Sequence, residues 1–416
     1  MAQIILGKKP SIVFFHKPDA GAIDFYRCIQ PMNMLAQAGW TVTQLPYITA
    51  FAHDEELKKH MPALLSADII YINTPGREYL TPLENLHDLD TTAKELGDKH
   101  IPQKFIFDYD DSLWDVPPYN PAFLWYGTAD AYFNDPVTGK KVEMYKNGKT
   151  YSQKATDGEI ITVKFDKKKN LERLNAVAHF LNLGHTITTT TSYLSTKLAK
   201  HIDGAALDLS RRPLLVPNAI DTNYLKPYTG PRNKDEVHIL WTMSSSHAID
   251  FQQVSPILGN LMRKYPNVHL HLMGDKNFEI GRNFPLSRLY RHPYINDVPT
   301  YWEFLSSLPI DIGIAWVNNT PFNLNKSPLK VAEYMALGVV PVASKTLYGD
   351  HFEEGVGIML TQDLEELSYK LELLITDKVY KRKIIEDGSI ILKDRFTTEA
   401  VLPKLEAAFY AAICKD

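Results

Sequence analysis

The chain alternates short apolar runs with segments in which apolar residues recur every three or four positions. Ser11–Phe15 and Thr41–Leu45 have the length and composition of buried strands, and Tyr26–Ala38 between them has the periodicity of an amphipathic helix. Strands separated by helices predict a parallel sheet. The other elements expected in the first half are strands at Ala67–Ile72, Lys104–Phe107, Thr186–Thr190 and Leu214–Pro217, and helices near Leu83–Leu96, Leu171–Leu181 and Ser192–His201.

The second half repeats this rhythm after a connector with three prolines in the fifteen residues from Pro217 to Pro231. A chain of 416 residues also exceeds what one hydrophobic core usually supports. We therefore expect two Rossmann-like domains, at 1–217 and 218–397, with a last helix at 398–416 that crosses back to the first. The other elements expected are strands at Val237–Trp241, His269–Met273, Asp311–Ala315 and Val340–Ala343, and helices at Ile249–Lys264, after Thr300, at Pro328–Leu337 and from Leu364 onward.

The alternation is interrupted at about 132–169. Asn147-Gly148 and Asp157-Gly158 are two-residue hairpin signals between strand-like segments, so we expect a β-meander inserted in the first domain. Residues 136–169 contain nine lysines, four acidic residues and no arginine, although the whole chain has a net charge of −4. This local excess favours a polyanionic partner, and a merely solvated surface is the simpler alternative. Three aromatic residues are expected to offer flat surfaces beside the lysines: Tyr145, Tyr151 and Phe165.

Composition narrows the class of protein. The chain has 44% hydrophobic and 23% charged residues, as ordinary globular proteins do, and its negative charge provides no general attraction for nucleic acid. The two cysteines, Cys28 and Cys414, lack the spacing of a disulfide framework or a zinc finger. Neither a signal peptide nor a membrane span of roughly 18 apolar residues is evident. We therefore expect a cytoplasmic protein with reduced cysteines.

One helix of the second half carries most of the chemistry. Ser327 is expected at its N-cap, Pro328 at its first position and Gly338 just after its end. A helix start offers free N–H groups and the positive end of the macrodipole. Because Lys326 and Lys330 flank this start, a diphosphate would find donors and cations together. Solvated lysines are the simpler alternative for each residue taken alone.

Glu333 lies one turn further on, where a carboxylate can accept hydrogen bonds from a ribose diol or pair with Lys330. An Asn, a Lys-Ser pair, a Lys and a Glu-Tyr pair in this order resemble the donor-binding region of retaining GT-B glycosyltransferases of the family 4 type, in a branch found in bacteria and phages. Asn325 stands where that family usually has its first glutamate. The resemblance implies an α/β GT-B fold, with two Rossmann-like domains facing a central cleft: an acceptor-side domain at 1–217 and a nucleotide-sugar-binding domain at 218–397. It also implies that these residues bind the donor: Asn323, Asn325, Lys326, Ser327, Lys330 and Glu333.

The segment after Val237–Trp241 resembles the phosphate loop of the same family. Ser244, Ser245 and His247 are expected to bind the donor diphosphate, and the glycine-rich loop with a basic pair that is usual there is missing. Lys326 or His247 is expected to supply the missing positive charge. For the serines, capping of a helix without any ligand is the alternative.

Neither half of the chain is expected to bind a metal. Asp108, Asp110 and Asp111 follow a strand of the first domain and should raise one another's pKa, which suits orientation of an acceptor hydroxyl or capping of the next segment. Asp108 and Asp110 have DxD spacing, but GT-B enzymes generally stabilise the leaving diphosphate with helix dipoles and side chains. His269 and His271 alternate on a strand, and the sequence indicates no third ligand near them.

The loops after the strands of a parallel sheet form its ligand crevice. In the first domain this directs attention to the loops His16–Asp24, Asn73–Arg77 and Asp108–Pro118, with Arg27 nearby. The residues expected to take part in catalysis are His16, Asp110, Asp111 and Lys326.

The resemblance implies transfer of a hexosyl or pentosyl group with retention at the anomeric carbon. A nucleotide diphosphate sugar is the expected co-substrate, without a metal or other cofactor. The lysine-rich insert motivates a hydroxymethylated base in DNA, including phage DNA, as one acceptor hypothesis. A polysaccharide, a lipid carrier, a protein or a small molecule is the alternative. Asn325 and the missing basic pair also keep open a sugar-nucleotide-binding module without catalysis.

Overall fold

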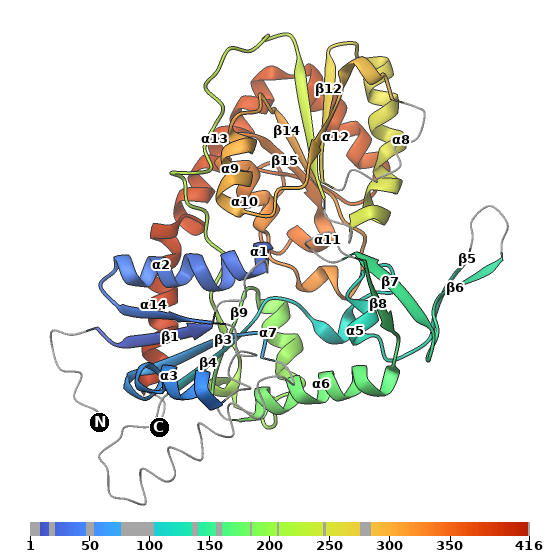
Figure 1. The fold of residues 1–416 in the computed structure, drawn as a ribbon. Coiled ribbons are helices and arrows are strands. Elements are labelled where there is room, and N and C mark those ends of the chain that lie inside the picture. Colours follow the sequence, from blue (N-terminus) through green and yellow to red (C-terminus); the bar gives the residue numbers. More distant parts are fainter. Residues whose placement is uncertain are drawn as a thin grey trace, which may run out of the picture. The chain divides into compact units, whose positions relative to one another are not determined.

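The computed structural model describes residues 9–15, 21–46, 54–75, 104–134, 140–154, 160–183, 185–205, 208–243, 247–274 and 284–414. The chain divides into two compact units (Figure 1). Unit 1 comprises Met1–Pro118, Ala122–Ala219 and Val401–Asp416, and unit 2 comprises Tyr119–Pro121 and Ile220–Ala400.

Unit 1 is built on a six-stranded parallel sheet with the order β10-β9-β4-β3-β1-β2. Its strands are β1 (Ser11–Phe15), β2 (Thr41–Leu45), β3 (Ile69–Asn73), β4 (Lys104–Tyr109), β9 (Thr186–Thr189) and β10 (Leu214–Leu215). Its helices are α1 (Gly21–Asp24), a π-helix (Phe25–Ile29), α2 (Gln30–Gln37), α3 (Asp54–Ser66), α5 (Phe123–Tyr126), α6 (Lys167–Asn182), α7 (Ser192–Ala199) and α14 (Thr398–Cys414).

Helices cover both faces of this sheet, so its inner strands are buried at nearly every position. On one face, Ile12 and Phe14 of β1 share a hydrophobic core with α2 and with α14, which contributes Phe409. On the other face, Val13 and Phe15 belong to a core that includes residues of α3, α6 and α7. Figure 1 labels these helices around the strands of the sheet.

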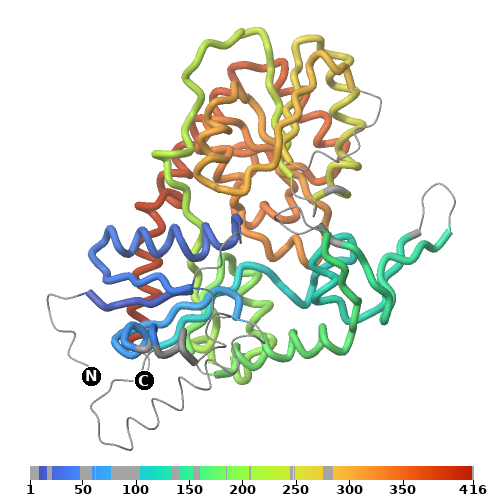
Figure 2. The backbone as a smooth tube through the Cα atoms, viewed as in Figure 1, coloured from blue at the N-terminus to red at the C-terminus, as the bar shows by residue number. Residues whose placement is uncertain are grey.

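The insert of unit 1 forms two separate antiparallel hairpins rather than one meander. They consist of β5 (Ala131–Asn134) with β6 (Lys141–Tyr145), and β7 (Thr150–Lys154) with β8 (Ile160–Lys164). The turn expected at Asn147-Gly148 does not pair β6 with β7, because Gly148 N–H donates to the carbonyl of Phe165 (2.8 Å). The β5–β6 hairpin extends away from the sheet of unit 1 (Figure 2).

The aromatic residues of the insert differ from expectation in their exposure. Phe165 is fully buried and lies against Tyr145 and Phe123, with ring centroids 5.4 and 5.8 Å away, so it presents no flat surface to a partner. Tyr132 and Phe133 on β5 are instead 40% and 45% exposed. The ammonium group of Lys141 lies 4.3 Å from the Tyr132 ring centroid.

Unit 2 contains a second six-stranded parallel sheet, with the order β13-β12-β11-β14-β15-β16. Its strands are β11 (Val237–Thr242), β12 (Val268–Gly274), β13 (Leu289–Pro293), β14 (Ile312–Ala315), β15 (Val340–Ser344) and β16 (Met359–Thr361). Its helices are α8 (Ala248–Lys264), α9 (Val298–Ser306), α10 (Leu329–Ala336), α11 (Lys345–Tyr348), α12 (Leu364–Thr376) and α13 (Lys378–Arg395).

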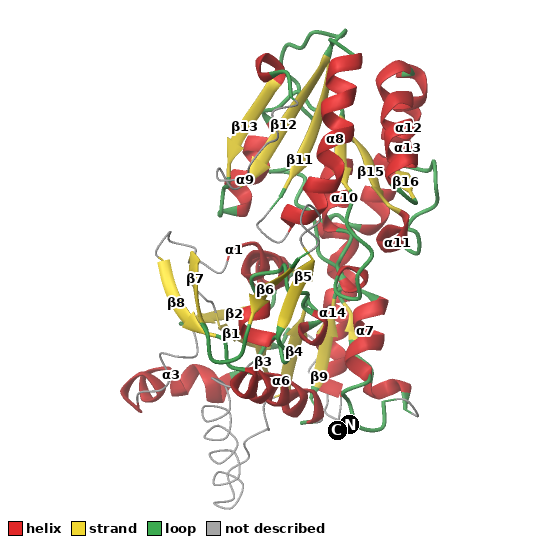
Figure 3. Ribbon diagram, turned by 90° about the vertical axis from the view of Figure 1, so that its right-hand side faces the viewer, coloured by secondary structure: helices red, strands yellow, loops and turns green. Residues whose placement is uncertain are grey.

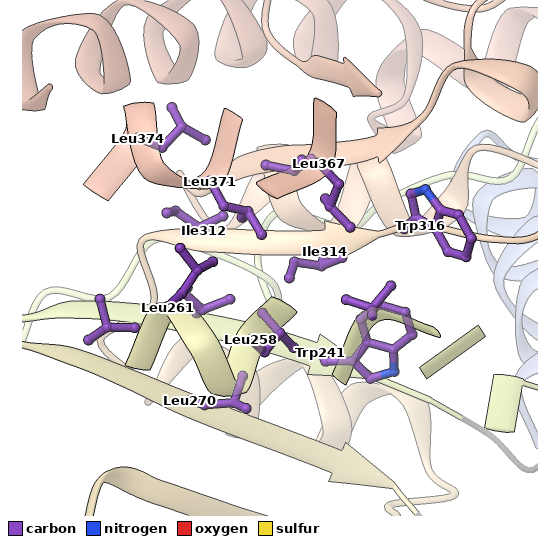
Figure 4. Close-up of a cluster of buried hydrophobic side chains, with 14 of the residues drawn as sticks. Trp241, Leu258, Leu261, Leu270, Ile312, Ile314, Trp316, Leu367, Leu371 and Leu374 are labelled. Carbon is purple, nitrogen blue, oxygen red and sulfur yellow. The ribbon is translucent and has the colours of Figure 1, made fainter. Parts of the chain in front are cut away.

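One face of this second sheet packs against α8 and α12. Figure 4 shows leucines of the two helices pointing toward Ile312 and Ile314 of β14, with Trp241 and Trp316 at one end. Gly313 belongs to the opposite face, where the Tyr334 ring of α10 lies so close that a Cβ on Gly313 would be 2.5 Å from it. The glycine therefore lets α10 pack directly on β14.

Helix α3 and strands β13 and β16 are among the elements that were not predicted. Helix α3 contains Pro62, which weakens its pattern. Strands β13 and β16 lie at the two edges of the second sheet, where β13 is mostly exposed and β16 has three residues. Edge strands need no continuous apolar run, so periodicity does not identify them. The helix expected near Leu83–Leu96 lies outside the described residues. None of the helices in the described part of the chain has the length and apolar character needed to cross a membrane.

A buried ion pair lies at the carboxyl end of the first sheet. Arg27, on the π-helix, donates through Nε and Nη2 to the two carboxylate oxygens of Asp108 (2.9 and 2.6 Å). The residues beside Asp108 in the sheet register, Asn73 and Thr188, also donate to it (2.9 and 2.6 Å). Arg27 Nη1 also donates to the carbonyl of Val216 (2.9 Å). Burial alone would lower the pKa of Arg27, but Asp108 raises it above its ordinary value.

We expect Asp108→Ala to destabilise unit 1 by about 3–5 kcal/mol, because Arg27 would remain buried without its counter-ion. For a domain of this size the unfolding transition should shift by roughly 6–20 °C, measurable by differential scanning calorimetry. Lys167→Ala is the control, since Lys167 and Asp130 form a partly exposed pair in the same unit, and it should cost about 0–1 kcal/mol. Equal losses from the two variants would contradict the structural role of Asp108.

Candidate active site

The strand order of each sheet identifies where a ligand would bind. In unit 2 the strands that follow β11 in sequence first extend the sheet on one side, as β12 and β13, and then on the other, as β14, β15 and β16. The order reverses between β11 and β14, which therefore flank the topological switch point. Open α/β sheets bind ligands outside the carboxyl ends of the strands at such a point. In unit 1 the switch point lies between β1 and β3. The loops after β11 and β14, and those after β1 and β3, are therefore the places to examine.

Helix α10 begins near the second switch point. It starts at Leu329, so Pro328 rather than Ser327 occupies the N-cap position and the expected serine cap is wrong. Its end is as predicted, because Gly338 follows the helix with a φ of +65° and donates its N–H to Met335 O (3.1 Å). The free N–H groups of the first turn follow Lys326, which is half-buried with its ammonium group 5.1 Å from the Phe322 ring centroid.

Glu333 is buried on α10 and its carboxylate has several partners. Trp302 Nε1 donates to Oε1 (3.2 Å), while the Lys330 ammonium group contacts Oε2 (3.0 Å). Tyr301 lies within hydrogen-bond distance of both Lys330 and Glu333 (3.0 and 3.4 Å). Burial and Glu333 raise the pKa of the Tyr301 phenol. Burial alone would lower the pKa of Lys330, but Glu333 raises it well above its ordinary value. Both the predicted ion pair and a fixed orientation of the carboxylate are present.

A second polar group surrounds the start of α8. His247 Nδ1 lies 2.9 Å from Asp250 Oδ2, and Asp250 Oδ1 accepts hydrogen bonds from the backbone and side-chain amides of Asn318 (2.9 and 2.6 Å). Asn323 Nδ2 donates to the Asn318 carbonyl (2.9 Å), which ties the loop after β14 to α8. Burial and the charge of Lys326 lower the pKa of His247. His247 is therefore neutral at pH 7, and Lys326 is the cation of this group.

The structure brings most of the predicted donor residues into one region of unit 2. Asn325 is buried, and its Nδ2 donates to the Pro321 carbonyl (2.5 Å) at the other end of the same loop. His247, Asn323, Asn325, Lys326, Ser327, Lys330 and Glu333 all lie on α10 or on the segments after β11 and β14. Ser244, Ser245 and His16 lie outside the described residues.

The carboxylates at the acidic strand end of unit 1 differ in their surroundings. Asp108 accepts four side-chain hydrogen bonds in the core. Asp110 and Asp111 follow β4 and are half-buried. Burial, followed by the charges of Asp111 and Asp108, raises the pKa of Asp110 to about 8. The expected mutual effect of the carboxylates is thus confirmed for Asp110, with burial as the larger cause.

Other residues of these regions were not predicted. Thr74, after β3, has a φ of +44°, which is rare for a β-branched residue and typical of strained functional loops. Its N–H donates to the Asp108 carbonyl (2.7 Å). Tyr301, Trp302 and Asn318 were missed because each lies far in sequence from the motif that it supports.

Comparison with known proteins supports the fold. The sequence matches no family model and no curated protein. Among solved structures, the chain resembles HepE from Anabaena in complex with UDP-glucose, with 13% identity, 97% of this chain and 100% of that chain covered, and a TM-score of 0.56. It also resembles a glycosyltransferase from Rickettsia africae, with 12% identity, coverage of 97% and 98%, and a TM-score of 0.60.

A third similar structure is the catalytic domain of starch synthase IV from Arabidopsis thaliana bound to ADP and acarbose, with 10% identity, coverage of 98% and 99%, and a TM-score of 0.58. At such identities the similarity shows the fold alone. The architecture is α/β with two parallel-sheet domains, as in the GT-B glycosyltransferases.

We expect Asp110→Asn to stabilise unit 1 at pH 8 by about 1–3 kcal/mol, with no difference from the parent below pH 4. The folded-state pKa of Asp110 lies above its ordinary value of 3.8, so the folded state binds this proton more tightly and stability falls as pH rises toward 8. Unfolding temperatures of the parent and the variant between pH 4 and pH 8 test whether the variant becomes the more stable protein as pH rises. An unchanged or lower unfolding temperature for the variant at pH 8 would contradict it.

Proposed function

We propose that the protein transfers a sugar from a nucleotide diphosphate sugar to an acceptor hydroxyl. The observation that carries the proposal is the convergence of Lys326, the start of α10 and the fixed carboxylate of Glu333 at the switch point of the second sheet. The GT-B fold supports it, and the similar structures of HepE and starch synthase IV contain UDP-glucose and ADP.

In this proposal the donor diphosphate lies at the first turn of α10. The N–H groups there and the helix dipole favour an anion, and Lys326 adds a full positive charge. Lys330 already forms an ion pair with Glu333, so we assign Lys326 as the cation that stabilises the leaving diphosphate. Glu333 accepts a hydrogen bond from the ribose of the donor. Trp302 and Lys330 hold its carboxylate in place, which limits the entropy lost when the nucleotide binds.

We further propose that transfer retains the anomeric configuration, as the resemblance to family 4 implies. The bond between the anomeric carbon and the diphosphate oxygen breaks as the acceptor oxygen attacks from the same face. The acceptor proton passes to the leaving phosphate, so no covalent nucleophile is required. Asp110 and Asp111 orient the acceptor hydroxyl. Catalysis rests mainly on electrostatic stabilisation of the leaving diphosphate.

The experiment that tests the proposal is incubation with a panel of UDP-, ADP- and GDP-sugars, with and without candidate acceptors. Release of nucleoside diphosphate identifies the donor and separates an enzyme from a binding module without catalysis. Nuclear magnetic resonance of the product then gives the anomeric configuration. If calorimetry detects nucleotide binding but no donor is consumed with any acceptor, the binding module is the better conclusion.

We expect Lys326→Ala to lower kcat at least about tenfold with little loss of stability, because charge grows on the diphosphate during transfer. Lys330→Ala should instead destabilise unit 2 by about 1–3 kcal/mol, since Glu333 would lose its cation within a partly buried pair. Steady-state kinetics and calorimetry on both variants separate the two roles. An unchanged kcat for Lys326→Ala would contradict binding of the donor diphosphate at this helix start.

A specific observation favours a polyanionic acceptor. Lys141, Lys146 and Lys164 of the insert are exposed, and Tyr132 and Phe133 lie exposed on the same hairpin as Lys141. Cations beside exposed aromatic rings suit a nucleic acid backbone with accessible bases. We therefore propose a hydroxymethylated base in DNA as the acceptor to test first, with a polysaccharide, lipid carrier or small molecule as the alternative.

The test uses a triple variant, Lys141→Gln, Lys146→Gln and Lys164→Gln. Deletion of the insert is unsuitable because it would remove Phe165 from the core. If the three lysines contact phosphates, the plot of log K against the logarithm of the salt concentration for duplex DNA should be less steep for the triple variant than for the parent, by about 3 in slope. Donor hydrolysis should be unchanged.

The matched control substitutes three exposed lysines elsewhere, Lys383, Lys393 and Lys404, which changes the net charge equally. Equal salt slopes for the two variants, or no binding of DNA by the parent at low salt, would exclude DNA in favour of the other acceptors.

A further inference from the structure

Histidines of three neighbouring strands gather on one face of the second sheet. His238 of β11 is the register partner of His269 of β12, and their rings are stacked with centroids 4.8 Å apart. His271 and His292 continue the row toward β13. Strand alternation places this row on the face opposite the core that contains Trp241. Strands β11, β12 and β13 lie side by side in Figure 3.

Glu236, just before β11, completes a set of three ligand atoms. One carboxylate oxygen lies 3.2 Å from His238 Nε2 and the other lies 3.9 Å from His269 Nε2. Together the ligand atoms of the three residues lie within 4.8 Å of one another. Asn233 Nδ2 donates to Glu236 Oε1 (3.1 Å), which fixes the carboxylate. The set contains His269 of the pair singled out in the sequence, but its partners are His238 and Glu236 rather than His271.

The other ring nitrogens of both histidines are also in contact with polar atoms. His238 Nδ1 lies 2.9 Å from His271 Nε2, and His271 Nδ1 lies 3.0 Å from His292 Nε2. His269 Nδ1 lies 3.2 Å from the hydroxyl of Tyr290. If Nε2 of His238 and His269 binds a metal, each Nδ1–H has an acceptor. Such outer hydrogen bonds orient metal-binding histidines and make them more basic.

The charges near the set also suit a cation. Asp311 lies close by, but Arg232 and Lys381 already pair with it (2.7 and 2.8 Å). Within the described residues, no lysine or arginine pairs with Glu236, whose side chain is 33% exposed and accessible to an ion from solvent.

We propose that Glu236, His238 and His269 bind one divalent transition-metal ion of the Zn²⁺ type. Two imidazoles and a carboxylate are a donor set that Zn²⁺ favours and that Mg²⁺ and Ca²⁺ do not. The site lies near the amino ends of β11 and β12, whereas the proposed donor site lies at the carboxyl end of the sheet. The ion therefore stabilises unit 2 by cross-linking two strands and the segment before them, and takes no part in transfer.

The test is calorimetric titration of the metal-free protein, without an affinity tag, with ZnCl₂. We expect saturable binding of one Zn²⁺ per chain, a rise of several degrees in the unfolding temperature of unit 2, and no such response to MgCl₂. Co²⁺ in place of Zn²⁺ should give visible absorption bands. Glu236→Gln and His269→Gln should each weaken Zn²⁺ binding at least about tenfold.

The matched control is His179→Gln, which removes an exposed histidine of α6 and should bind Zn²⁺ as the parent does. Circular dichroism checks that each variant is folded, and binding of the nucleotide should be equal in all of them. No uptake by the parent, or equal affinity in the parent and both site variants, would overturn the proposal. Because nucleotide binding is measured separately, this outcome leaves the proposed function untouched.

Discussion

The buried pair of Arg27 and Asp108 is the constraint on which the architecture of unit 1 depends. A carboxylate with no exposure is stable only if cations and donors compensate its lost hydration. Its partners come from the π-helix, β3 and β9, and Arg27 also holds the segment after β10. The pair therefore fixes the ends of three strands at one point. The π-helix is consistent with this demand, since such local widening of a helix is common where a side chain is held for a special purpose.

Unit 2 also contains a buried carboxylate, Glu333, whose lost hydration must be compensated by other groups. Here the partners are Trp302, Lys330 and Tyr301, and the lysine is about one-third exposed. Both carboxylates are buried, so the two ion pairs differ only in the exposure of the cation: Arg27 is enclosed with Asp108, whereas Lys330 beside Glu333 reaches solvent.

The α/β rhythm was predictable because most strands of both sheets are buried on both faces and appear as continuous apolar runs. Edge strands of the sheets do not form such apolar runs. Strand β13, for example, contains Arg291, His292 and Pro293. The turn at Asn147-Gly148 was misassigned because a local signal cannot show that Gly148 bonds to Phe165 instead of closing a hairpin. The segment 321–338 was predicted to contain a helix that ends just before Gly338, and it does, yet the partners of its polar side chains depend on register and packing, which sequence spacing does not encode.

Polar groups at opposite ends of the two sheets have different physical constraints. At the carboxyl ends of the first sheet, unfavourable features persist: Thr74 has a left-handed backbone conformation and the pKa of Asp110 is raised. At the amino ends of the second sheet, polar side chains satisfy one another. The row of histidines with Glu236 does this across three strands. Its position follows from cross-strand register, because a shift of one residue would move His238 to the opposite face and into the core.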